Sequence, residues 1–319
     1  MKNKSEISIC VVNWNTREDL RLCLSSIRDS GMEPETIVCD NASSDGSAEM
    51  VRHNYPEFIL ISNKKNIGFG RANNLCFEKC SQKYVLIANP DIIVEKTALE
   101  NLKSVLDNDS TIGAVGALLL DSDGVPQKHY YRKFPSLLQH LIFHTVLRII
   151  FLHFNFIRYR LWEDNTETEQ IIDVDQPPGA CILIRRDLLS HIGGFDERFD
   201  LFYEDVDLCK RIKNAGFRIV MNPGARIIHS GQKSLNKELP SNLKHLFFQS
   251  GTLYFRLHKG AWQAFIYKII YIVDDFVKIV IRALLYPFLP GKRVTLRANI
   301  VNSIIFIKRV ITGERAVLP

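Results

Sequence analysis

The sequence predicts an α/β fold with an open, mostly parallel central sheet flanked by helices. Apolar runs at residues 7–12, 36–39, 58–62 and 84–88 are each followed by polar turn residues and then by a helical pattern. This strand, loop and helix repeat fills about 110 residues and indicates parallel strands joined by helical crossovers. Polar residues gather where the strands end, and ligands bind at that edge of such a sheet.

The predicted elements follow in order along the chain. Thr16 stands where a helix N-cap belongs, ahead of apolar residues at helical spacing up to Ile27. Beyond residue 112 the pattern is mixed, with a helix expected over residues 205–215 and ended by Gly216. Further strands are expected at residues 114–120, 181–184, 217–221 and 226–229.

Composition and charge divide the chain into a large domain and a smaller appendage. The 319 residues are 46% hydrophobic, which is enough for a full core. Residues 241–319 carry 12 Lys and Arg against 3 Asp and Glu, whereas residues 1–240 carry 29 against 32. This distribution argues against nucleic-acid binding and favours an anionic membrane surface as a partner of the tail. Seven cysteines without a CxxC pair, and no signal peptide, favour a reduced cytoplasmic protein.

Two apolar stretches, at residues 137–161 and 261–289, stand apart from the strand pattern. Charges or histidines interrupt both, so neither reaches the roughly 20 apolar residues that a bilayer span needs. In the second stretch, Lys268, Asp275 and Lys278 fall on one helical face together with Arg282. We therefore expect an amphipathic helix lying in a membrane interface, and the alternative is a helix packed on the protein's own core.

Polar residues follow each of the first four predicted strands. They are Asn13 and Asn15, Asp40 and Asn41, Asn66 and Arg71, and Asn89 and Asp91. A carboxylate in such a place can hold a divalent cation, as Asp91 could, or contact a nucleotide's ribose or base, as Asp40 could. Each position also fits an ordinary turn. The glycines before Arg71 suit a backbone that approaches a phosphate.

An acidic cluster of Glu204, Asp205 and Asp207 opens the helix predicted over residues 205–215. Carboxylates in a first helical turn offset the macrodipole by about 0.3–1 kcal/mol and need no other function. Acids recur at the ends of the predicted strands, however, and this favours an active-site wall. His229 closes the last predicted strand, where a single histidine is either structural or a ligand.

The order of the motifs is more specific than any one of them. VVNWN, VCDNASSDGS, NIGFGRANN, IANPD, GACILIRRD, GGFDERF, YEDVDLC and IIH follow one another over roughly residues 6–235. This order closely resembles the family 2 glycosyltransferases of the GT-A fold, and within them the rhamnosyltransferase-like members that build bacterial O-antigen and other cell-envelope polysaccharides. The resemblance implies a catalytic domain at residues 1–240, with a nucleotide-sugar-binding half (1–111) and an acceptor and catalytic half (112–240). Residues 241–319 would then be a basic, amphipathic, helical and membrane-associating region.

The resemblance also implies roles for individual residues. Asp205, with Glu204, matches the catalytic ED motif, and Asp40 contacts the donor nucleotide with Arg71 nearby. Asn89-Pro90-Asp91 takes the place of the family's DxD motif, so Asp91 becomes the metal contact, with His229 beside it. The remaining expectations are donor contacts from Asn13, Asn15, Asn41, Asn66 and Asn89, and acceptor contacts from Gly179, Ala180, Asp196 and Asp207.

The implied reaction is an inverting glycosyl transfer with Mg²⁺ or Mn²⁺ as cofactor. The expected donor is dTDP-L-rhamnose, with UDP-galactose or UDP-N-acetylglucosamine as the alternative. The expected acceptor is a polyprenyl-diphosphate-linked saccharide, reached by a protein that lies peripherally on the cytoplasmic face of the inner membrane.

Other classes of protein fit less well. A nucleotidyltransferase should carry a Gly-rich, basic loop directly after the first strand, and VVNWNTRED contains no glycine. A dehydrogenase should carry G-x-G-x-x-G after a strand, and this motif is missing. A non-catalytic saccharide-binding protein would not require both Asp205 and Asp91, and a transfer assay would distinguish it.

Overall fold

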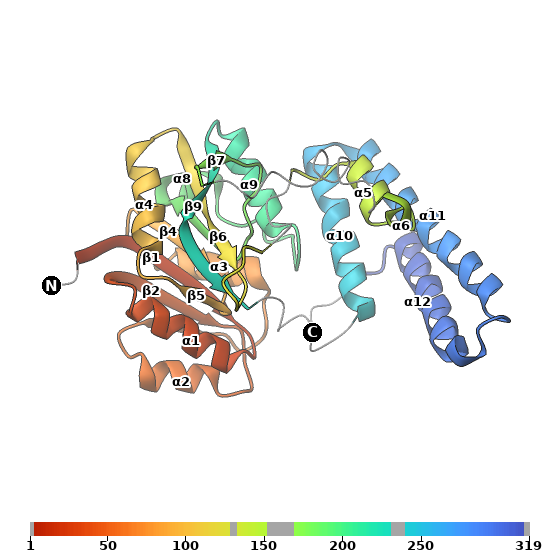
Figure 1. The fold of residues 1–319 in the computed structure, drawn as a ribbon, viewed down its shortest axis with the longest axis horizontal. Coiled ribbons are helices and arrows are strands. Elements are labelled where there is room, and N and C mark those ends of the chain that lie inside the picture. The colour runs from red at the N-terminus through yellow and green to blue at the C-terminus, as the bar shows by residue number, and fades with distance from the viewer. Residues whose placement is uncertain (1–2, 128–132, 152–168, 231–239, 316–319) are drawn as a thin grey trace. The chain divides into compact units, whose positions relative to one another are not determined.

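The computed structural model describes residues 3–127, 133–151, 169–230 and 240–315 (Figure 1). The chain forms two compact units. The first combines residues 1–134 with 163–238, and the second combines residues 135–162 with 239–318. The apolar stretch that begins at residue 137 therefore belongs with the C-terminal helices.

A mixed sheet forms the centre of the first unit. Its order is β3-β2-β1-β4-β8-β6-β9-β5, and β7 pairs with β9. The first four strands in the chain are parallel, as predicted, whereas β8 runs antiparallel to both β4 and β6. The strands are β1 (Asn3–Asn13), β2 (Met32–Asp40), β3 (Ile59–Ser62), β4 (Tyr84–Ala88), β5 (Ile92–Val94), β6 (Ile112–Leu120), β7 (Ile172–Asp173), β8 (Cys181–Arg185) and β9 (Arg218–His229).

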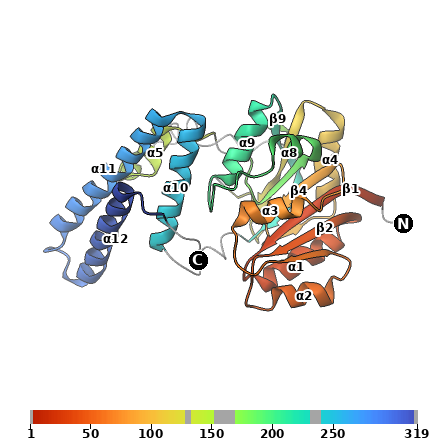
Figure 2. The ribbon, with the colours of Figure 1, turned by 180° about the vertical axis from the view of Figure 1, so that it is seen from behind.

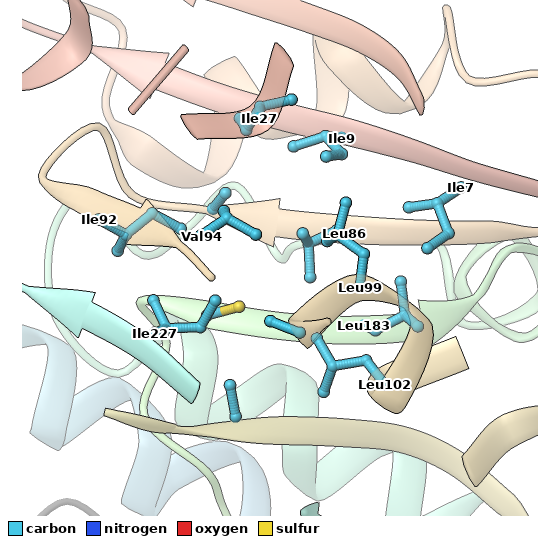
Figure 3. Packing of buried hydrophobic residues seen from close by; sticks show 14 of the residues in the cluster. Ile7, Ile9, Ile27, Leu86, Ile92, Val94, Leu99, Leu102, Leu183 and Ile227 are labelled. Atoms are coloured by element: carbon cyan, nitrogen blue, oxygen red, sulfur yellow. The ribbon is translucent and has the colours of Figure 1, made fainter. Parts of the chain in front are cut away.

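Helices cover both faces of this sheet. Ile7 and Ile9 of β1 point to one face, where they join apolar residues of α1 (Arg17–Arg28), α2 (Ser47–Asn54) and α4 (Ala98–Asn108) (Figure 3). Cys10 points to the other face, which α3 (Phe69–Phe77), α8 (Arg186–Ile192) and α9 (Glu204–Asn214) cover (Figure 2). All seven cysteines are buried free thiols. This is the α/β architecture that the sequence predicts.

The last strand differs from the prediction. Two strands were expected at residues 217–221 and 226–229, but β9 is continuous from Arg218 to His229. Its register with β6 shifts between Asn222 and Arg226, so the intervening residues form a bulge. The Asn222 side chain accepts a hydrogen bond of 3.0 Å from the Gly224 N–H inside that bulge. Strands β5 and β7 were not predicted, because three and two residues are too few to show an alternation of apolar and polar side chains.

The second unit is helical. It contains α5 (Leu137–Phe143), α6 (Arg148–Phe151), α10 (Pro240–His258), α11 (Ala261–Leu285), a 3₁₀ turn (Pro290–Lys292) and α12 (Arg293–Thr312). Aromatic rings fill its centre, among them Phe255 stacked on Tyr267 with 4.8 Å between ring centroids. A Cβ on Gly251 would overlap the Tyr267 hydroxyl, so this glycine permits the close approach of α10 to α11. Among the helices that the structure describes, none is long and apolar enough to cross a membrane.

The charged face of α11 corrects one expectation. We expected Asp275, Lys278 and Arg282 to face water or lipid headgroups. The structure instead buries Asp275 completely inside the helical unit, where Lys244 and Ser303 donate hydrogen bonds to its carboxylate. The spacing of the charges identified one helical face, but it could not tell which way that face points.

Candidate active site

The sheet topology brings the predicted site residues to one edge. Strands β1, β2, β4, β6 and β9 all run in one direction, and β8 runs in the other. The carboxyl ends of β1, β2, β4 and β9 and the start of β8 therefore lie at the same edge of the sheet. Asn13, Asp40, Asn89, Ala180 and His229 stand at or next to these strand ends.

A buried hydrogen-bond cluster joins the ends of β1 and β2. Asn13 donates to Oδ1 of Asp40 at 3.0 Å and to Oγ of Ser43 at 3.1 Å. The other oxygen of Asp40 accepts from the Ser43 N–H at 3.0 Å. Asp40 is 2% exposed, and these bonds hold its carboxylate in one position. Such a fixed carboxylate at a strand end is suited to a nucleotide's ribose or base.

The other predicted donor-site amides hold the surrounding loops. Asn15 has a left-handed backbone (φ 53°) and accepts from the Ser44 N–H at 2.8 Å. Asn41 donates to the Gly68 carbonyl at 3.2 Å and accepts from Asn63 at 2.9 Å. The Asn66 side chain accepts from the Gly68 N–H at 3.0 Å. These contacts fix the loop that precedes α3.

Arg71 connects α3 to the loop before α9. Its guanidinium lies 3.1 Å from Asp200 and also donates to the Glu197 carbonyl. Asn74, one turn later, exchanges two hydrogen bonds with the Phe195 backbone, at 2.8 and 2.9 Å. The geometry therefore assigns Arg71 to loop packing, and one third of its side chain stays exposed for a ligand.

Asp91 and His229 form a pair at the ends of β4 and β9. His229 Nε2 lies 3.4 Å from Asp91 Oδ1, and the two side chains are 7% and 10% exposed. His229 Nδ1 lies 3.2 Å from Gln127 Oε1, and Gln127 also donates to the His229 carbonyl at 2.6 Å. Across the described ranges, no group of three or more His, Cys, Asp and Glu side chains converges as a metal cage.

The loop before β8 links Asp205 to the turn that carries Asp91. The Ala180 carbonyl accepts from the Asn89 N–H at 2.9 Å, which ties the loop to the Asn89-Pro90-Asp91 turn. The Asp205 carboxylate lies directly against Gly179, where a Cβ would be 2.6 Å from Oδ2. One loop thus touches both the predicted metal turn and the predicted base.

Glu204 is a buried neighbour of Asp205. The burial of its carboxyl, and then the charge of Asp205, raise the pKa of Glu204 to about 8. Its Oε2 atom is buried and has no hydrogen-bond partner in the described part of the chain. Phe202 and Tyr203, just before α9, both have positive φ, a strained backbone that is typical of functional sites.

Asp207 and Asp196 are engaged by arginines. Arg211 donates to Asp207 at 2.8 Å from the next turn of α9, and the Asp207 side chain is 1% exposed. Arg198 makes a bidentate contact with the Asp196 carboxylate and holds the pKa of that carboxyl below its usual range. These two acids stabilise the walls of the site in the structure, and acceptor contact by either stays a prediction.

Three residues of this region were missed by sequence reasoning. Ser43 joins Asn13 to Asp40, Asn74 fixes the loop before α9, and Gln127 orients His229. Ser43 had a local signal, because a serine three residues after an aspartate often bonds back to it. Asn74 and Gln127 had none, since their partners are 121 and 102 residues away in the sequence.

A parallel series of first strands, a site at their carboxyl ends and a mixed second half containing the antiparallel strand β8 are the features of the GT-A glycosyltransferase fold. Residues 8–193 match Glycosyl transferase family 2, and the chain belongs to that family. The protein is a glycosyltransferase.

Named relatives and a solved structure agree with this assignment. The N-acetylglucosaminyl-diphospho-decaprenol L-rhamnosyltransferase of Mycobacterium tuberculosis is 27% identical, over 81% of this chain and 87% of the relative. Rhamnosyltransferase WbbL of Escherichia coli is 26% identical, over 70% of this chain and 83% of the relative. The mannosyltransferase PcManGT of Pyrobaculum calidifontis, solved with GDP-Man and Mn²⁺, superposes with a TM-score of 0.53 at 15% identity, covering 97% and 88% of the two chains. The last likeness shows the fold alone.

Proposed function

We propose that this glycosyltransferase moves L-rhamnose from dTDP-L-rhamnose to a hydroxyl of a polyprenyl-diphosphate-linked saccharide, with inversion at the anomeric carbon. The observation that carries the proposal is the position of Asp205. Its carboxylate rests on Gly179, in the loop that is hydrogen-bonded to the Asn89-Pro90-Asp91 turn. Two relatives named as rhamnosyltransferases, one of them acting on a decaprenyl-diphosphate sugar by its name, favour the donor and the acceptor class.

In the proposed reaction Asp205 is the general base. It takes the proton of the acceptor hydroxyl while that oxygen attacks the anomeric carbon from the face opposite the nucleoside diphosphate. The bond to the diphosphate breaks, and the electron pair leaves with the diphosphate oxygen. General-base assistance of this kind contributes about 10²–10⁴ in rate. Glu204, which the same motif selects, is its buried neighbour, and the charge of Asp205 contributes to the raised pKa of Glu204 after burial.

The donor nucleotide is assigned to the cluster at the ends of β1 and β2. Asp40 is held by Asn13 and Ser43 and would accept from the ribose or base. Asn15, Asn41, Asn66 and Asn89 hold the loops around it, and the exposed part of Arg71 would meet the diphosphate.

Asp91 and His229 would hold the divalent cation. A Mg²⁺ ion commonly takes one or two protein carboxylates plus substrate phosphates, and Mn²⁺ also accepts imidazole. A carboxylate and an imidazole 3.4 Å apart at a strand end fit this donor set, with the diphosphate supplying the other oxygens. When bound, the ion neutralises charge on the leaving diphosphate.

We further propose that residues 1–240 are the catalytic domain, with donor binding in residues 1–111 and acceptor binding in residues 112–240. Gly179, Ala180, Asp196 and Asp207 would line the acceptor side. The basic region at residues 241–319 would keep the enzyme at the cytoplasmic face of the inner membrane, where polyprenyl-linked saccharides are presented.

A thermal-shift panel of nucleotide sugars tests the donor assignment. With Mn²⁺ present, dTDP-L-rhamnose should raise the melting temperature more than UDP-galactose or UDP-N-acetylglucosamine at equal concentration. A larger shift with either UDP-sugar would replace the rhamnosyl assignment and keep the reaction class. No shift with any nucleotide sugar, together with no transfer to a lipid-linked acceptor, would contradict the proposed function.

A further inference from the structure

Helix α11 carries an apolar stripe that points away from the helical unit. The stripe runs from Trp262 to Leu284 through Phe265, Ile269, Val273, Phe276 and Val280, at spacings of three or four residues that align on one helical face. Trp262, Phe276 and Leu284 are 70%, 62% and 67% exposed. Contiguous exposed apolar surface of this kind marks an interaction site rather than an ordinary protein surface.

The opposite face of α11 is buried, with aromatic rings toward its start and two acids, Asp274 and Asp275, in its middle. The Asp275 carboxylate accepts hydrogen bonds from Lys244 of α10 and from Ser303 of α12, the latter at 2.8 Å. Asp274 accepts from the Val146 N–H at 2.8 Å and from Lys278. A helix on the surface of a globular protein normally turns its polar residues outward. α11 buries its two acids and leaves the apolar stripe outside, which favours an apolar environment on that side.

Burial of these two aspartates changes the charge of the unit's surface. Glu314 is the one further carboxylate in the described residues of this unit, since residues 135–151 and 240–315 hold three acids in all. Exposed cations lie at both ends of the stripe, with Lys259 just before α11 and Lys292 and Arg293 just after it. Among the described residues of this unit, exposed cations therefore outnumber the single exposed acid, Glu314.

We propose that the outer stripe of α11 lies in the interface of an anionic bilayer, with Lys259, Lys292 and Arg293 on lipid phosphates. A second copy of this chain fits less well, because pairing two such faces would bring like charges together at both ends. Each cation near an anionic surface strengthens the attraction, and burial of the apolar stripe adds to it. The inference deepens the proposed function and rests on it, because it names the surface that meets the membrane where the acceptor is presented.

Vesicle sedimentation of the full-length protein tests this assignment. Wild type should bind vesicles of phosphatidylcholine and phosphatidylglycerol at roughly 7:3 far better than pure phosphatidylcholine, and high salt should weaken the binding. The double variant Trp262→Glu/Phe276→Glu should bind at least tenfold less. The matched control is Leu22→Glu/Val125→Glu, which places two acids on exposed apolar positions of the first unit and should bind as wild type.

Two further measurements keep the outcomes separate. A thermal shift with donor nucleotide reports the proposed function in every variant, so loss of vesicle binding with an intact shift concerns the stripe alone. If the double variant has a lower melting temperature than wild type, the single variant Leu284→Glu is used in its place. Undiminished vesicle binding by the stripe variants would overturn the proposal. The proposal would also be overturned if wild type did not bind anionic vesicles, or if wild type formed a dimer that the stripe variants could not form.

Discussion

The Asp205 carboxylate occupies the space beside Gly179 that any larger residue would need. A Cβ on Gly179 would lie 2.6 Å from Oδ2 and 3.0 Å from Cβ of Asp205. The next residue, Ala180, accepts a hydrogen bond from Asn89. Gly179 therefore allows the start of α9 to approach the loop before β8, and that loop is hydrogen-bonded to the turn after β4.

Gly179→Ala is expected to displace the Asp205 carboxylate. A methyl group 2.6 Å from Oδ2 of Asp205 forces the carboxylate or the loop to move. Misplacement of a catalytic group by about 1 Å lowers the rate about 10²-fold. Steady-state kinetics should show this loss in kcat, with donor affinity kept. Gly291→Ala, where a Cβ meets nothing within 4 Å, should leave kcat unchanged. Wild-type kcat in Gly179→Ala would contradict the close contact.

Glu204→Gln is expected to change the pH dependence of stability. The folded-state pKa of Glu204 is about 8 against an ordinary 4.5, so between these values the folded protein keeps a proton that the unfolded chain has released. Stability must then fall as pH rises through this window. Glutamine cannot lose a proton, so its free energy of unfolding should not fall in this window. Between pH 5 and pH 8 the variant should therefore gain on the order of 3 kcal/mol in stability relative to wild type. Urea unfolding of both proteins at both pH values measures this difference. If the stability of wild type and variant changed equally with pH, Glu204 would not be a buried neutral acid.

Removal of the divalent cation is expected to abolish transfer. Excess chelator should stop the reaction and added Mn²⁺ or Mg²⁺ should restore it, because the diphosphate leaves with its charge neutralised. Asp91→Ala should weaken binding of the nucleoside diphosphate at least tenfold when metal is present and change it little when metal is absent. Calorimetry with and without Mn²⁺ measures both. Full activity in chelator would assign the diphosphate charge to Arg71 or His229 instead.

Asp275→Ala is expected to destabilise the helical unit. The carboxylate is fully buried and joins α10, α11 and α12 through Lys244 and Ser303. Removing the carboxylate takes an acceptor from Ser303 and from Lys244, whose side chain is 36% exposed, which costs about 1–3 kcal/mol. Denaturation should show this loss, whereas Arg297→Ala, an exposed site on α12, should be neutral. Equal stability of both variants would show that the buried charge network is dispensable.

The sequence predicted the carboxyl ends of the first four strands well, but β1 and β2 each begin four residues earlier than expected. The four parallel strands and the helix that begins with Glu204 and Asp205 follow from apolar runs and turn residues, within one or two positions at most ends of these elements. The bulge in β9 was missed, because residues 222–225 read as a turn between two strands until the partner strand β6 is known.

The candidate site was predictable in composition but not in contacts. Motif order selected Asp40, Asp91, Asp205 and His229. The sheet topology brings the strand ends beside Asp40, Asp91 and His229 to one edge, whereas Asp205 lies in the first turn of α9. The arginine partners of Asp196 and Asp207 lie only two and four residues away, so the sequence alone could have indicated them. The inward turn of Asp275 depends instead on packing against Lys244 of α10, which no local pattern encodes.

Sugar transfer by Asp205→Asn tests the central claim most directly. A base acts on the transition state, so the variant should transfer sugar at least 10²-fold more slowly and bind donor nucleotide as wild type does. Asp187→Asn removes a first-turn carboxylate from α8, outside the site, and controls for the loss of charge. Near wild-type transfer by Asp205→Asn, with Glu204→Gln or Asp207→Asn inactive instead, would contradict the account.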